Sequence, residues 1–134
     1  MDTRTSLGAL LLAMTATASH AEGDVPCEAT SHVDEMRCLG QELTRLDQVL
    51  DAAYPAALAA RPESDDFDRR KNREQLRQSQ LAWRHYMEEN CDLLGGLEGG
   101  GNLWVSDFAA RCRKTETEQR IEFLGRVANG SFGG

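Results

Sequence analysis

The sequence predicts an all-α protein: a small antiparallel array of three helices closed by two disulfides. Apolar residues recur at spacings of three and four along most of the chain, which is the period of a helical stripe, and no pattern typical of strands competes. The chain has 134 residues, a length that suits one domain. Its four cysteines, an even number behind an export signal, indicate two structural bridges.

The N-terminal segment, residues 1–21, is typical of a signal peptide. A short positively charged start precedes an apolar or small run at residues 7–18, and small residues then mark a cleavage site that ends at Ala21. The apolar run is shorter than the roughly 20 residues of a membrane-spanning helix. We therefore expect a periplasmic or secreted domain at residues 22–134, with its core at about 27–128 and no membrane span in the mature chain.

The first helix is expected at about residues 31–60. Ser31 is a typical N-cap residue, and the carboxylates that follow it favour the positive end of the helix dipole. Apolar residues then continue at spacings of three and four. Pro55 has no backbone N–H to donate inside the helix, so we expect a kink or a short break near residues 51–55.

Two further helices are expected after a turn at residues 61–64. The second begins near Asp65 and ends at a glycine-rich turn that covers residues 95–102. The third runs over about 103–128. These lengths suit an array of helices that are joined by tight turns.

The four cysteines are Cys27, Cys38, Cys91 and Cys112. On antiparallel helices, counting from the two turns puts Cys38 and Cys112 at one height, with Cys91 nearer the end that the segment carrying Cys27 passes. We therefore favour the pairs Cys38–Cys112 and Cys27–Cys91. The alternative pairs Cys38 with Cys91 and Cys27 with Cys112. No C-x-x-C spacing supports a zinc site or a redox pair.

The formal net charge is −7, which argues against some partners and favours others. Nucleic acid and anionic membranes select basic surfaces, so neither is expected to bind. A basic protein would instead be attracted to this chain.

The sequence contains no residue set typical of an enzyme. It lacks an H-E-x-x-H metal motif, a G-x-S-x-G nucleophile turn and the G-K-[ST] ending of a phosphate loop. His85 lies three and four residues before Glu88 and Glu89, but a solvated helix face explains that spacing better than a metal site. We expect no catalytic residue, no metal and no cofactor.

A few polar and aromatic residues are candidates for special roles. Asp47, Gln80 and Arg120 fall on or beside apolar stripes, and a buried charge needs a partner. We hypothesise that Asp47 and Arg120 pair across the bundle, with Gln80 nearby, as a structural network. Trp104 follows the glycine-rich turn and is a candidate partner-binding residue, because aromatic residues dominate binding hot spots. Glu98 is the other candidate, as the only acidic residue of a turn that an inhibitor could insert into an enzyme cleft.

Short motifs also run through the chain in a specific order. They are Cys27 and Cys38 with ten residues between them, L-D-x-x-L-D-x-x-Y at 46–54, L-x-x-x-Q-x-x-W-x-x-Y at 76–86 before Cys91, and C-x-x-T-x-x-x-x-R-x-x-x-L at 112–124. Together they resemble the LprI-like domain family, which is named for a lysozyme inhibitor. Asp51 departs from the family pattern, which usually has asparagine there.

The resemblance implies a helical fold and, for some members, lysozyme inhibition. It favours an exported, non-catalytic binding protein whose partner is a basic lysozyme. The alternative function is a periplasmic structural or envelope-stress module that binds another protein or a small ligand.

Overall fold

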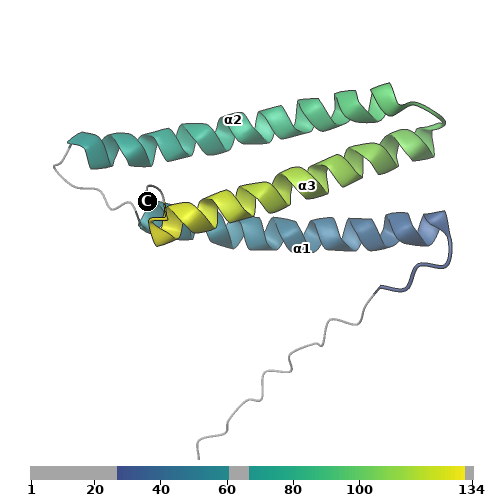
Figure 1. Cartoon of the computed structure of the whole chain (residues 1–134), viewed down its shortest axis with the longest axis horizontal. Helices are drawn as coiled ribbons and strands as arrows, with labels where there is room; N and C mark the ends of the chain where they lie inside the picture. The colour runs from purple at the N-terminus through teal and green to yellow at the C-terminus, as the bar shows by residue number, and fades with distance from the viewer. Residues whose placement is uncertain (1–26, 61–66, 132–134) are drawn as a thin grey trace, which may run out of the picture.

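The computed structural model describes residues 27–60 and 67–131, which form three helices and no strand (Figure 1). The helices are α1 (His32–Ala59), α2 (Phe67–Glu98) and α3 (Asn102–Asn129). Successive helices run in opposite directions, so the predicted antiparallel three-helix array is confirmed.

Two predicted segments lie outside the described residues, namely the signal peptide at 1–21 and the turn at 61–64. The expected start of the second helix near Asp65 lies there too. In the part of the chain that the structure describes, no helix combines the length and the apolar character that crossing a membrane requires.

The start of α1 is capped as predicted. Ser31 has an extended backbone, and its hydroxyl oxygen accepts a hydrogen bond from the backbone N–H of Asp34 at 3.2 Å. The short break expected near residues 51–55 is absent, because the helix continues through Pro55 to Ala59. Leu50 and Ala57, on either side of the proline, are both buried in the core, and this packing offsets the lost hydrogen bond.

The apolar core lies where the C-terminal half of α3 packs between α1 and α2 (Figure 1). Its buried members are Leu50, Ala57, Leu76, Leu124 and Val127. Because α3 is the central helix, α1 and α2 meet mainly through long side chains, such as Arg84, whose Nη2 lies 3.3 Å from Asp51 Oδ1.

The two disulfides join Cys27 to Cys38 and Cys91 to Cys112, with Cα–Cα distances of 5.5 and 5.4 Å. Two bridges are therefore confirmed, but the favoured pairing and its alternative are both wrong. The predicted register is wrong because α2 continues to Glu98, so the turn between α2 and α3 is residues 99–101 and lies later in the chain. Cys91 therefore comes level with Cys112.

The segment before α1 explains the other bridge. Arg37, in the second turn of α1, donates to the carbonyl oxygen of Glu28 at 3.2 Å and to the Cys27 sulfur at 3.4 Å. The segment therefore folds back along its own helix, and Cys27 reaches Cys38 instead of α2.

The glycine-rich segment is shorter as a turn than expected. Residues 95–98 are the last turn of α2, which leaves residues 99–101 as the connection to α3. Gly95 is buried, and a Cβ atom placed on it would lie 2.6 Å from the Val105 carbonyl oxygen. Glycine at this position allows the two helices to approach closely.

Candidate binding surface at the turn between α2 and α3

The turn between α2 and α3 depends on two glycines in the left-handed region. Gly99 and Gly100 have φ values of 72° and 101°, which residues with a side chain rarely adopt. Gly101 then caps α3, and its carbonyl oxygen accepts a hydrogen bond from the Trp104 N–H at 2.9 Å. The tryptophan is thus fixed in the first turn of α3.

Large apolar side chains are exposed around this turn. We call them the turn-end surface, which consists of Leu93, Leu94 and Leu97 of α2 and Leu103 and Trp104 of α3. Leu97 is 73% exposed and Trp104 is 49% exposed. Several exposed large apolar side chains at one end of a small protein are typical of an interaction site.

The Trp104 indole is held in place although half of it is exposed. His32 of α1 stacks on it with ring centroids 4.3 Å apart and an interplanar angle of 24°. Phe108, one turn further along α3, lies 6.4 Å from the indole centroid. A side chain that is already ordered loses little conformational entropy when it binds a partner.

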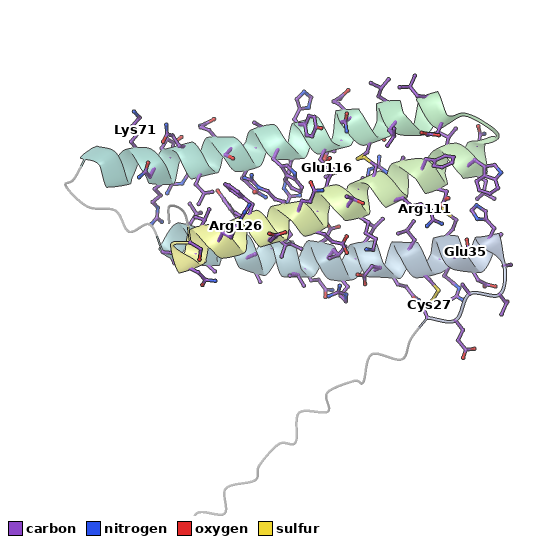
Figure 2. All side chains as sticks on the ribbon, in the orientation of Figure 1. Cys27, Glu35, Lys71, Arg111, Glu116 and Arg126 are labelled. Carbon is purple, nitrogen blue, oxygen red and sulfur yellow. A yellow bond between two sulfur atoms is a disulfide. The ribbon has the colours of Figure 1, made fainter. Side chains whose placement is uncertain are left out.

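A polar cluster behind the tryptophan joins α1 to α3. The Asp107 side chain is almost fully buried, and the Arg111 Nε donates to both of its carboxylate oxygens at 3.0 Å. The Arg111 guanidinium also lies 3.8 Å from the Glu35 carboxylate across the gap between the helices (Figure 2). The hydrogen bonds and the negative charge of Asp107 raise the pKa of Arg111 above its ordinary value.

This cluster was not predicted from the sequence. Asp107 and Arg111 are four residues apart on one helix, and that spacing of opposite charges is the signal that could have revealed the pair. The stacking of His32 on Trp104 had no comparable signal, because the two residues are distant in the sequence.

The structure brings the two predicted partner-binding residues to the same end of the molecule. Glu98 is the last residue of α2 and is exposed, and Trp104 follows across the turn. Their part in binding remains a prediction.

The predicted polar network is formed only in part. Arg120 Nε donates to Gln80 Oε1 at 2.8 Å, and its Nη2 donates to Ser79 Oγ at 3.1 Å. Asp47 is exposed on α1 and makes no hydrogen bond or ion pair with a described residue. The expected Asp47–Arg120 pair is therefore not formed. Asp47 lies one position beyond the buried Leu46, so its side chain points away from the buried stripe.

No group of three or more histidine, cysteine, aspartate or glutamate side chains in the described ranges could hold a metal ion. His85, the histidine considered for such a role, is exposed on α2.

The fold and the turn-end surface define a class, that of small disulfide-linked helical proteins with an exposed apolar end. Residues 27–124 match the family described as lysozyme inhibitor LprI, and the chain belongs to this family. The family is one of inhibitors rather than of enzymes, and together with the two disulfides it indicates an exported protein. Comparisons with curated proteins and with solved structures give no match.

Proposed function

We propose that the protein inhibits a lysozyme, and that the turn-end surface enters or covers the cleft of that enzyme. The family supports a lysozyme as the partner. The observation that carries the choice of surface is the Trp104 indole, half exposed yet held by His32. A lysozyme cleaves its substrate between two carboxyl groups in a cleft, so a narrow turn that occupies the cleft would block it.

Charge supports the same proposal. The chain carries a net charge of −7, and Glu98 places one of its carboxylates beside the turn. A basic lysozyme would be attracted to such a protein, and the attraction would raise the association rate more than the final affinity. The proposed site of action is the periplasm or the exterior, after removal of residues 1–21 as a signal peptide.

The test measures inhibition of a c-type lysozyme by the oxidised protein and by two variants. Trp104→Ala is expected to weaken inhibition by about tenfold or more, because it removes an aromatic anchor. Glu98→Lys is expected to weaken it about twofold to fivefold, and raised salt should weaken the wild type.

Matched controls separate the surface from general damage. Leu81→Ala removes another exposed apolar side chain of α2, and Glu89→Lys makes the same charge change as Glu98→Lys, both away from the turn. Neither control should alter inhibition. If only the control variants lost inhibition, the lysozyme-binding surface would lie away from the turn. Wild-type protein that fails to inhibit at roughly 50 µM would refute the proposed function and favour a module that binds another periplasmic protein.

A further inference from the structure

A second feature of the molecule lies away from the turn. An open cleft of about 220 Å³ runs between α2 and α3 and is lined by Trp83, Glu116, Gln119, Arg120 and Phe123. Figure 2 shows Glu116 in the space between these two helices. The lining combines two aromatic rings with one guanidinium, which is the composition of a site for a small organic molecule.

The guanidinium of Arg120 makes no ion pair with a carboxylate of the described residues, although the residue is only 8% exposed. Its Nε and Nη2 atoms donate to two neutral groups, the Gln80 amide and the Ser79 hydroxyl. A buried charge without a counter-ion is costly, and burial lowers the pKa of Arg120 from its ordinary value. The positive charge is thus available to an anion.

The same region holds unused hydrogen-bond donors. The Nη1 atom of Arg120 makes no hydrogen bond within the described ranges, and Arg120 lines the open cleft. Next to it, the amide nitrogen of Gln80 is buried without a partner, but Gln80 does not line the cleft. The Nη1 donor of Arg120 is best satisfied by an oxyanion, because hydrogen bonds between a guanidinium and a carboxylate are among the strongest in proteins.

The rings supply the apolar part of the site. The Arg120 guanidinium carbon lies 4.8 Å from the centroid of Phe123 and 5.6 Å from that of Trp83. These contacts hold the guanidinium in one place, so it is already oriented before a ligand arrives.

We propose that this cleft binds a small monocarboxylate with a flat apolar body, the carboxylate on Arg120 and the body against Trp83 and Phe123. A single negative charge is specified because the chain itself carries −7, and a polyanion would be repelled. The proposal is independent of lysozyme inhibition, since it uses none of the turn-end residues.

Glu116 is the residue that opposes such a ligand. It lines the cleft one helical turn before Arg120 and makes no ion pair with it. Its negative charge repels an incoming carboxylate and competes for the guanidinium. Removing that charge should therefore tighten binding, a result that a purely structural role for Arg120 does not predict.

The experiment titrates the oxidised full chain with benzoate and follows the Trp83 indole N–H and the Arg120 Nε–H by NMR. Benzoate should shift both signals saturably, whereas benzamide, which has the same shape without the charge, should not. Glu116→Gln should tighten benzoate binding about twofold to fivefold, the effect of one partly exposed charge.

The matched control is Glu122→Gln, which removes the same charge from an exposed position of α3 that does not line the cleft. It should leave benzoate binding unchanged. The proposal is overturned if benzoate shifts neither signal in either the wild type or Glu116→Gln. It is also overturned if benzamide binds as well as benzoate, or if Glu122→Gln tightens benzoate binding as much as Glu116→Gln.

Discussion

Gly95 and Gly96 are neighbours in α2 with opposite surroundings. A Cβ atom on Gly95 would lie 2.6 Å from the Val105 carbonyl oxygen and 3.1 Å from the Ala109 Cβ, whereas one on Gly96 would meet nothing within 4 Å. The first contact involves backbone, which cannot move aside without separating α2 from α3.

We therefore predict opposite effects of the same substitution at these two positions. Gly95→Ala should lower the free energy of unfolding by about 1–3 kcal/mol through overpacking. Gly96→Ala should raise it by up to about 1 kcal/mol, because alanine favours an exposed helical position. Urea unfolding of the oxidised proteins measures both, and equal effects would contradict the close approach.

Arg120 is expected to stabilise the fold through its stem and its hydrogen bonds. Arg120→Ala should cost about 2–4 kcal/mol, because it empties the space beside Trp83 and Phe123 and leaves Gln80 without a partner. Arg120→Met keeps the apolar stem and should cost less. Unchanged thermal stability of Arg120→Ala would show that the network has no structural role.

For single residues, the sequence predicted which side chains lie close together but not which of them form hydrogen bonds. Gln80 and Arg120 could be placed near one another because both fall on inward stripes of their helices. Asp47 could not be assigned, since a shift of one position along a helix turns a side chain by about 100°. Ser79 accepts from Arg120 although it lies beside the stripe, and no local pattern marks it.

Several polar contacts define the N-terminal end of α1. The Asp34 carboxylate accepts from the Ser31 hydroxyl at 2.8 Å, the Thr30 hydroxyl at 3.0 Å and Arg37 at 3.3 Å. These hydrogen bonds lower the pKa of Asp34 from 3.8 to about 2, and the bond from Ser31 has the largest effect. A carboxylate at this position also favours the helix dipole.

The lowered pKa predicts how this cap responds to acid. The ionised form is favoured in the folded state, so the stabilisation is complete above pH 3.8 and is lost as the pH falls through about 2. Ser31→Ala should raise the pKa of Asp34 toward 3.8 in an NMR titration of its carboxyl carbon. Thr44→Ala, which removes another hydroxyl of α1, should leave it unchanged.

The helices themselves were predictable because their apolar spacing extends over many turns. The ends of the helices and the register between them were harder to predict, for reasons that the structure identifies. Gly95 and Gly96 weaken a helix by only about 1 kcal/mol each, and packing against α3 exceeds that penalty. The resulting extension of α2 is the change that moved Cys91 level with Cys112. Pro55 was likewise tolerated because buried residues flank it.

For the whole molecule, the two disulfides should differ in their contribution to stability. Each closes a short loop, with sequence separations of 11 and 21 residues, and loop closure alone is worth about 3 kcal/mol in either case. Cys91 is fully buried between α2 and α3, whereas Cys27 is exposed before α1.

Removing the buried bridge is therefore expected to cost more. The double variant Cys91→Ala/Cys112→Ala should lower the free energy of unfolding further than Cys27→Ala/Cys38→Ala, because it also empties packed volume. Urea unfolding under oxidising conditions compares the two. A larger loss in the second variant would show that the segment before α1 matters more than the contact between helices.

The positions of these bridges give the two ends of the bundle different dependence on the redox state of their surroundings. Both disulfides lie in the half of the bundle that carries Trp104, whereas the apolar core lies in the other half. In the presence of a thiol reductant, amide hydrogen exchange should accelerate first around the turn, while the core amides stay protected. A chain held in the reducing cytoplasm would then keep its helices but lack an ordered turn, so any activity of that surface would begin only after export.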